Sequence, residues 1–338
     1  MNKEVLRQFL EKEHIPFEVD VSLKEKTWIG FGAAVSFWIV PVSRDELIRA
    51  VYFLNSNQMP FDVVGATSNC LFSEEKNYFC IISTSRVRGI VFDEESRVIT
   101  CGCGESLTRL VKRSVAKGAG GLAGLVGIPG TVGAAAVNNA GAFNDLISRL
   151  VLRVEISMPD GDVRWISCEE MGYRPRSSVI KRGELSAVVL AVELRWIDAD
   201  VEMEGQRMTK AIAERIRTQE MKLKNLGSVF ATGKGLYKEI AEMHRMYGAV
   251  MRLAGFGLSM VLRVFPRFPA IRLLNRITLS FFHKKFAYPV ISDCGLNCFV
   301  RCPGSTEKDF FDYVDWIFGL TNGRLALEVE VKKSHEGE

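Results

Sequence analysis

Histidine is scarce in this chain of 338 residues, and the chain contains no long hydrophobic run. The four histidines are His14, His244, His283 and His335, and no spacing of histidine and cysteine matches a zinc site, so we expect no metal. The first residues lack the apolar run and the small-residue cleavage site of a signal peptide. No uninterrupted apolar stretch approaches the roughly 18 residues that a membrane-spanning helix needs. These absences favour a cytoplasmic location.

Net charge is also small, at +4, and this does not indicate a nucleic-acid partner. The eight cysteines fit no disulfide framework, so we expect free and mostly buried thiols. Cys294, Cys298 and Cys302 are evenly spaced and are expected to line one face of a strand or a helix. With 47% hydrophobic residues, a chain of this length can bury the cores of two domains.

The first half of the chain alternates predicted strands with predicted helices. Ser43, with Glu46 three residues later, predicts a capping box, and Ser106 is placed to cap the next helix. Hairpins are expected over residues 89–104 and 151–167, the second with its turn at Pro159-Asp160-Gly161.

The pattern of the sequence changes near residue 200, where the alternation of strands and helices ends. A polar helix over residues 198–223 indicates a domain junction. The tail predicts a helix from residue 307 that Asn322-Gly323 ends, followed by one final strand over residues 324–333.

The stretch GIPGTVGAAAVNNAGAF, residues 127–143, has no ionisable side chain and so cannot perform acid–base chemistry. Glycine lets a ligand approach the backbone closely, and successive amide groups form concave anion sites, to which a following helix N-terminus adds partial positive charge. The loop Gly65–Asn69, after a predicted strand, is also uncharged. Tight turns between packed elements would explain either loop alone. Two such loops in one α/β region favour a dinucleotide held along its length.

Residues 127–133, followed by Asn139-Ala140-Gly141-Ala142, resemble the signature of the UDP-N-acetylenolpyruvoylglucosamine reductases, also called UDP-N-acetylmuramate dehydrogenases. The segment TWIGFGAA matches the first glycine segment of that family with one extra residue, and the resemblance extends from about Thr27 to Lys332.

This resemblance implies an α+β fold with a vanillyl-alcohol-oxidase-type FAD-binding module and a C-terminal α+β substrate domain. The FAD-binding module would comprise two α/β subdomains, residues 1–86 and 87–200, and the substrate domain would comprise residues 201–338.

The resemblance also implies a reaction. NADPH would be the hydride donor, and the enolpyruvyl ether of a nucleotide sugar, UDP-N-acetylglucosamine enolpyruvate, would be reduced to UDP-N-acetylmuramate in peptidoglycan precursor synthesis. FAD would be held without a covalent bond. Its expected contacts are Gly65, Ala66, Thr67, Ser68, Asn69, Gly127, Ile128, Pro129, Gly130, Thr131, Gly133, Asn139 and Gly141.

Three scattered segments resemble the catalytic motifs of the family. GSVF places Ser228 at the position of the proton donor, and YRPRSSVIK, counted back from SVIK, places Arg176 at the position of the arginine. Strand alternation puts Glu328 and Glu330 on the same face and cannot choose between them, whereas the family's EV ending favours Glu330 as the acid beside the arginine. Arg174 and Asn297 are expected to bind substrate.

Other positions depart from the family pattern. Ala231-Thr232-Gly233 replaces Lys-Asn-Pro, Gly295 replaces a histidine and Arg301 replaces an asparagine. Two alternatives therefore stay open: a related flavoprotein oxidoreductase with another substrate, and a membrane-associated flavin-binding protein without this activity.

Residues 243–292 form a basic and hydrophobic segment that is longer than the corresponding connection in the family. It contains arginine and lysine residues between apolar runs and has no aspartate or glutamate. The segment favours a helical insertion packed on the substrate domain. The alternatives are a peripheral contact with a membrane and a surface for a protein partner.

Overall fold

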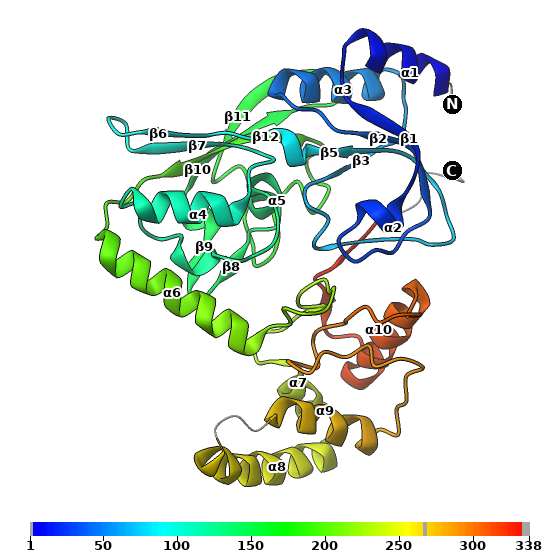
Figure 1. The fold of residues 1–338 in the computed structure, drawn as a ribbon, viewed down its shortest axis with the longest axis vertical. Helices are drawn as coiled ribbons and strands as arrows, with labels where there is room; N and C mark the ends of the chain where they lie inside the picture. Colours follow the sequence, from blue (N-terminus) through cyan, green and yellow to red (C-terminus); the bar gives the residue numbers. More distant parts are fainter. Residues whose placement is uncertain (1–2, 266–268, 333–338) are drawn as a thin grey trace.

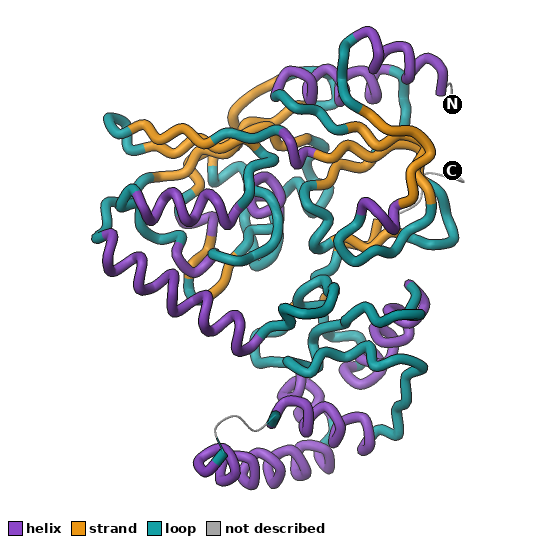
Figure 2. Tube along the Cα trace, in the orientation of Figure 1, coloured by secondary structure: helices purple, strands orange, loops and turns teal. Residues whose placement is uncertain are grey.

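The computed structural model describes residues 3–265 and 269–332. Strands gather in the N-terminal part of the molecule, and helices and loops dominate the C-terminal part (Figures 1 and 2). The first sheet has the order β1 (Phe17–Ser22), β2 (Ala34–Ile39), β5 (Tyr78–Ser83) and β3 (Asp62–Val64). Strand β1 is antiparallel to β2, while β2 and β3 run parallel to β5. Every residue of β5 is buried, as a central parallel strand requires.

Helices α1 (Lys3–Lys12) and α3 (Arg44–Ser56) cover one side of this sheet (Figure 1). Leu6 of α1 and Leu47 of α3 share a core with Phe37 of β2. Ser43 caps α3 as predicted, because its hydroxyl accepts a hydrogen bond from the Glu46 amide. The Glu46 carboxylate accepts from the Val42 amide, so the reciprocal bond lies one residue earlier than a capping box requires.

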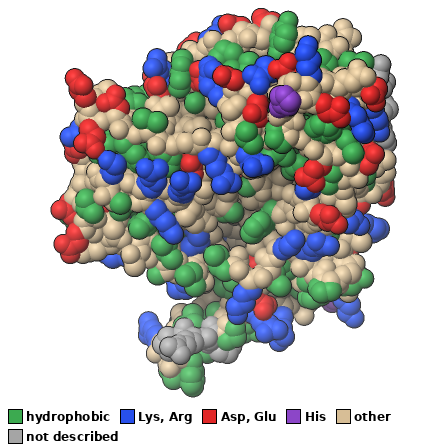
Figure 3. All heavy atoms as spheres, turned by 45° about the horizontal axis from the view of Figure 1, so that its top comes forward, with side chains coloured by type: hydrophobic (Ala, Val, Ile, Leu, Met, Phe, Trp, Pro, Cys, Tyr) green, Lys and Arg blue, Asp and Glu red, His purple; other side chains and the backbone are tan. Residues whose placement is uncertain are grey.

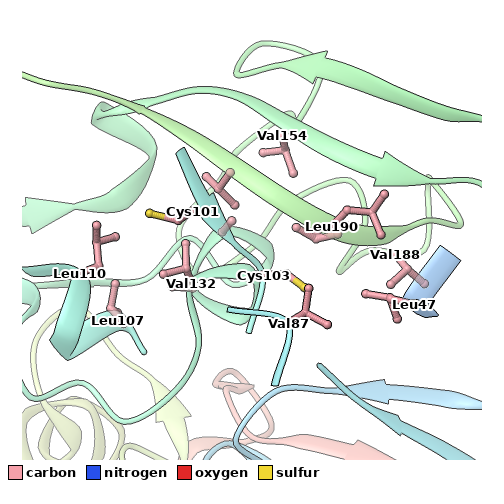
Figure 4. Close-up of a cluster of buried hydrophobic side chains, with 14 of the residues drawn as sticks. Leu47, Val87, Cys101, Cys103, Leu107, Leu110, Val132, Val154, Val188 and Leu190 are labelled. Atoms are coloured by element: carbon pink, nitrogen blue, oxygen red, sulfur yellow. The ribbon is translucent and has the colours of Figure 1, made fainter. Parts of the chain in front are cut away.

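The second sheet is antiparallel, in the order β11 (Val163–Ser167), β10 (Val151–Ser157), β12 (Val188–Arg195), β7 (Val98–Gly102) and β6 (Ile90–Asp93). Both predicted hairpins, β6–β7 and β10–β11, are confirmed. Helices α4 (Leu107–Ala116) and α5 (Val132–Val137) pack against the sheet. Figure 4 shows Leu107, Leu110 and Val132 in one buried cluster with Cys101 and Leu190.

Helix α6 (Val201–Thr218) begins at the cap residue Asp200 and ends five residues before the predicted boundary. Its Ala211 belongs to the core of the two sheets, whereas Leu226 is the first buried residue after α6 that belongs to the C-terminal core. Packing therefore associates α6 with the N-terminal part, and the division of the chain into domains near residue 200 stays a prediction.

The C-terminal core combines aliphatic side chains with aromatic ones, including Phe230, Phe299 and Tyr313. Its helices are α7 (Leu236–Met243), α8 (Arg245–Val264), α9 (Ala270–Phe281) and α10 (Glu307–Thr321). Asn322, in the left-handed conformation, ends α10 as predicted. Shorter elements are α2 (Leu23–Lys26), β4 (Cys70–Phe72), β8 (Gly141–Ala142), β9 (Asp145–Leu146) and β13 (Phe230–Ala231).

The prediction of one final strand over residues 324–333 is wrong. Two short strands replace it: β14 (Ala326–Leu327) pairs with β13, and β15 (Glu330–Lys332) pairs with β4. The chain crosses between them from the C-terminal core to the N-terminal part, since the Glu328 amide donates to Val229 O and the Glu330 amide to Asn69 O. This crossing brings two glutamates to the junction. Lys333 lies outside the described residues.

Candidate active site

A cavity of about 1220 Å³ lies where the N-terminal sheets meet the C-terminal core. This volume exceeds the roughly 300–1,000 Å³ of a typical small-molecule site, so a dinucleotide and a second ligand can share it. Both uncharged loops line the cavity, together with the crossing segment and the loops that contain Arg176, Ser228 and Asn297.

The two uncharged loops are fastened to each other. The Ser68 hydroxyl donates to the Pro129 carbonyl at 2.8 Å. A Cβ atom at Gly65 would lie 2.5 Å from Thr131 Oγ1, so only glycine permits this contact. At Gly127, φ is +75°, and an added Cβ would press on the Arg215 side chain at 3.1 Å. The two glycines therefore permit close packing of one loop against Thr131 and of the other against Arg215.

All of the residues that we expect to contact FAD line the cavity except Asn139. Asn139 is buried behind the groove at φ +47°, and its Nδ2 donates to the Arg174 carbonyl at 3.0 Å. Its neighbours Asn138 and Ala140 line the cavity instead. The asparagine therefore fixes the shape of the loop from behind.

A buried arginine of α6 also lines this cavity, and the sequence analysis did not identify it. Arg215 is only 5% exposed, and its guanidinium donates to the Val126 carbonyl and the Gln219 side chain. Its Nη2 atom is buried without a hydrogen-bond partner, and burial lowers the pKa of the group. A buried cation in this state has the chemistry to hold an anionic ligand.

The three predicted catalytic side chains meet in the same cavity although 154 positions separate the first from the last. Ser228 is exposed on a loop wall. Arg176 Nε lies 2.9 Å from Glu328 Oε1, so the acid beside the arginine is Glu328 and not Glu330 as expected. Glu330 faces Lys332 at 3.4 Å and Lys181 at 4.0 Å. In one continuous strand, Glu328 and Glu330 would share a face. The break between β14 and β15 instead gives the two glutamates different neighbours.

Comparisons with known proteins agree with this geometry. Residues 35–167 match the family model of an FAD binding domain. A UDP-N-acetylenolpyruvoylglucosamine reductase of Synechococcus sp. is 35% identical over 214 residues, which span 62% of this chain and 69% of that protein. Its counterpart in Acaryochloris marina is 31% identical over 222 residues, which span 66% of this chain and 72% of that protein.

The chain belongs to the UDP-N-acetylenolpyruvoylglucosamine reductase family.

The fold of the reductase agrees with a solved structure of the Thermus caldophilus enzyme of the same name. The TM-score is 0.69 at 24% identity, with 94% of this chain and all of that one covered. The expected α+β fold with a vanillyl-alcohol-oxidase-type FAD-binding module is confirmed, and the reductase is an FAD-dependent oxidoreductase.

The residues of the cavity fit FAD. The loops at Gly65 and Thr131 line a cavity with room for a diphosphate, and Arg215 offers the buried positive charge that its phosphates would neutralise. Trp28 also lines the cavity and is 49% exposed, so it presents an aromatic surface at the wall. Trp28 belongs to the glycine segment TWIGFGAA, and the sequence analysis did not identify it as a residue of the cavity.

The two predicted substrate contacts differ in position. Asn297 lines the cavity, and its amide side chain bonds both the amide and the carbonyl of Phe230, at 2.9 and 2.8 Å. It thereby fixes the strand that follows Ser228. Arg174 is exposed and is absent from the described lining of the cavity.

Two positions that depart from the family pattern, Gly295 and Arg301, have defined surroundings in the structure. Gly295 lines the cavity, and no atom lies within 4 Å of where its Cβ would be. Arg301 donates to the Ile29 carbonyl and lies over the Phe31 ring, so it fastens the C-terminal part to the first glycine segment.

The evenly spaced cysteines do not share one face of a helix or strand as expected. Turns between the cysteines break any regular period, and Cys294 and Cys298 line the cavity while Cys302 bonds the Pro289 carbonyl.

The Glu328 carboxyl should make stability depend on pH. Burial raises its pKa above the ordinary 4.5, although Arg176 and Lys181 act in the opposite direction. A raised carboxyl pKa favours the protonated folded state, so this stability is complete below pH 4.5 and is lost as pH rises through the folded-state pKa. Relative to Glu328→Gln, which stays neutral, the wild type should lose free energy of unfolding from pH 4.5 toward neutrality.

Urea denaturation of both proteins across this pH range measures the difference. The exposed Glu11→Gln variant is the control for the chemical change and should show the smaller dependence. Parallel curves for wild type and Glu328→Gln would contradict the expectation.

Proposed function

We propose that the enzyme reduces the enolpyruvyl ether of UDP-N-acetylglucosamine enolpyruvate to UDP-N-acetylmuramate, with NADPH as the hydride donor, in peptidoglycan precursor synthesis. One observation carries the proposal. Ser228, Arg176 and the glutamates of the crossing segment open into the cavity that the FAD-binding loops line. The relatives named above carry the name of this reaction.

The reaction needs a hydride on one alkene carbon and a proton on the other. The two uncharged loops would hold FAD, which would provide the hydride chemistry, with NADPH as the reductant. The Ser228 hydroxyl would give the proton, which solvent then replaces, and close positioning compensates for the weak acidity of a serine. The Arg176 guanidinium would stabilise the enolate that forms beside the substrate carboxylate.

The two glutamates would have different roles in this scheme. Glu328 would hold the Arg176 guanidinium in place through their ion pair of 2.9 Å. Glu330 lies between Lys181 and Lys332 and would keep two cations in the wall of the cavity. Lys181 also donates to Asn138, so this cluster connects the catalytic wall with the FAD-binding loop.

A second candidate is the same reductive chemistry on a different substrate. Gly295 leaves open space where the family has a histidine, and Thr232 of the altered segment bonds Glu239 of α7 instead of the cavity wall. Gly295 lies in the half of the cavity that the C-terminal part provides, whereas Thr232 belongs to the same part but is absent from the described lining.

We also propose a cytoplasmic location and non-covalent flavin. All eight cysteines are free, which suits a reducing compartment. Burial raises the pKa values of the Cys70 and Cys103 thiols, both in the cavity wall, to about 12, so they stay protonated and unreactive toward the flavin.

Stopped-flow spectroscopy tests the proposed reaction in its two halves. NADPH should bleach the bound flavin, and the enolpyruvyl substrate should restore its colour within the turnover time, with NADH slower in the first half. A flavin that NADPH reduces but the enolpyruvyl nucleotide leaves reduced would favour the second candidate. A screen of other enol ethers against the reduced enzyme then identifies the acceptor.

A further inference from the structure

Helix α8 exposes a strip of large apolar side chains at the end of the molecule opposite to α1 and α3 (Figure 1). Their exposed fractions are 78% for Met246, 75% for Leu253, 71% for Phe256, 56% for Met260 and 69% for Val264. These residues recur at intervals of three, four and seven, which places them on one face of the helix. So large an exposed apolar surface marks an interaction site in a soluble protein.

Basic residues follow one edge of this strip. Arg245, Arg252 and Arg263 are seven and eleven residues apart, so they share one side of α8 next to the apolar face. No aspartate or glutamate occurs between residues 243 and 292. Arg267 of the same segment lies outside the described residues.

Helix α9 extends the same surface. An open groove of about 480 Å³ lies along α9 beside Val250 of α8, and its lining includes Leu273, Phe281 and the exposed Arg276. Figure 3 shows hydrophobic and basic side chains together at this end of the molecule. An apolar groove with a cation at its edge matches an acyl chain with an anionic headgroup.

The opposite face of α8 is packed, which favours a helix lying in the plane of a membrane. In length and composition α8 is the one helix in the described chain that qualifies as a membrane span, although arginines interrupt its apolar run. Tyr247 is fully buried, and its hydroxyl pairs with Thr278 of α9, while Leu258 is 8% exposed. A spanning orientation would separate these contacts, whereas an interfacial orientation keeps them.

We propose that α8 and α9 dock the reductase on a membrane surface of anionic lipids. The apolar strip of α8 enters the boundary between headgroups and acyl chains, and the arginines at its edge bind lipid phosphates. The positive charge of residues 243–292, without any acidic residue, selects an anionic surface over a neutral one. Residues 243–292 were expected to form a helical insertion packed on the substrate domain, but α8 packs through one face and exposes the other.

Vesicle flotation of the FAD-loaded full-length protein tests this docking. Wild type should float with vesicles of phosphatidylglycerol and phosphatidylcholine, and not with phosphatidylcholine alone. The double variant Leu253→Asp/Phe256→Asp should weaken binding by at least about tenfold. Arg252→Gln and Arg263→Gln should each weaken it by about fivefold, with a smaller effect at high salt. Val91→Asp, at a 65% exposed apolar site on β6, is the matched control and should bind like wild type.

Retained flavin absorbance shows that each variant is folded. Wild type that stays unbound at low salt would overturn the proposal, as would equal losses in the α8 variants and in Val91→Asp. Sedimentation velocity tests whether a second copy of the chain covers the apolar strip instead of lipid. A dimer that Leu253→Asp/Phe256→Asp dissociates, with no vesicle binding, would assign the strip to a second copy of the chain and reject the lipid surface.

Discussion

Replacing Ser228 by alanine is expected to slow reoxidation of the reduced flavin by the enolpyruvyl substrate by about 10²–10⁴-fold, the range for loss of a positioned proton donor. The hydroxyl lies on an exposed loop wall of the cavity, so alanine removes a proton without leaving a packing defect. Reduction of the flavin by NADPH requires no proton from this residue and should continue at the wild-type rate.

Single-turnover stopped-flow measurements separate these two half-reactions. Ser96→Ala, in the exposed turn between β6 and β7, is the matched control and should leave both rates unchanged. If Ser228→Ala slowed both half-reactions equally, the residue would act through the shape of the cavity. If it slowed neither, another group would donate the proton.

The sequence predicted the form of the two uncharged loops well because their signal is local, while their contacts with FAD stay a prediction. Glycine, small residues and the absence of charge within a few positions of Gly65 and Gly130 define the shape of the backbone, and the structure brings both loops to one cavity. Capping of α4 by Ser106 and the turn at Gly161 were equally predictable, since each depends on neighbours within three residues.

The pairing of Arg176 with Glu328 depends on distant contacts and could not be predicted. Alternation along residues 324–333 assumes one strand in one sheet, but β14 pairs with β13 and β15 pairs with β4, in two separate sheets. The Glu330 amide donates to the Asn69 carbonyl, although more than two hundred residues separate the two in sequence. Only the folded structure therefore shows that Arg176 forms its ion pair with Glu328.

Arg215 did leave a signal in the sequence. Met208, Ala211, Ile212 and Arg215 follow the spacing of a buried helical stripe, so the arginine occupies a position where an apolar residue is expected. A cation on such a stripe indicates a buried anionic partner, because burial without one is unfavourable. No carboxylate forms an ion pair with it in the part of the chain that the structure describes, so we expect an anionic ligand to be its partner.

Arg215→Met should therefore weaken FAD binding and stabilise the flavin-free protein at the same time. Loss of a charge-assisted hydrogen bond to phosphate, worth about 1.5–3 kcal/mol, raises the Kd for FAD by about 10–100-fold. In the apoprotein the guanidinium is desolvated and one nitrogen lacks a partner, so an apolar side chain of similar length relieves the cost of burial. Fluorescence titration with FAD and thermal melting of the apoprotein measure the two effects.

The opposite signs distinguish this role from simple packing, because a structural defect would lower both affinity and stability. Arg215→Lys keeps the charge but loses the planar fork of donors, so its affinity should fall between those of wild type and Arg215→Met. Arg217→Met, on the same helix at an exposed site paired with Glu214, should change neither quantity. An unchanged Kd in Arg215→Met would place the phosphates of the cofactor away from α6 and leave the buried charge without an explanation.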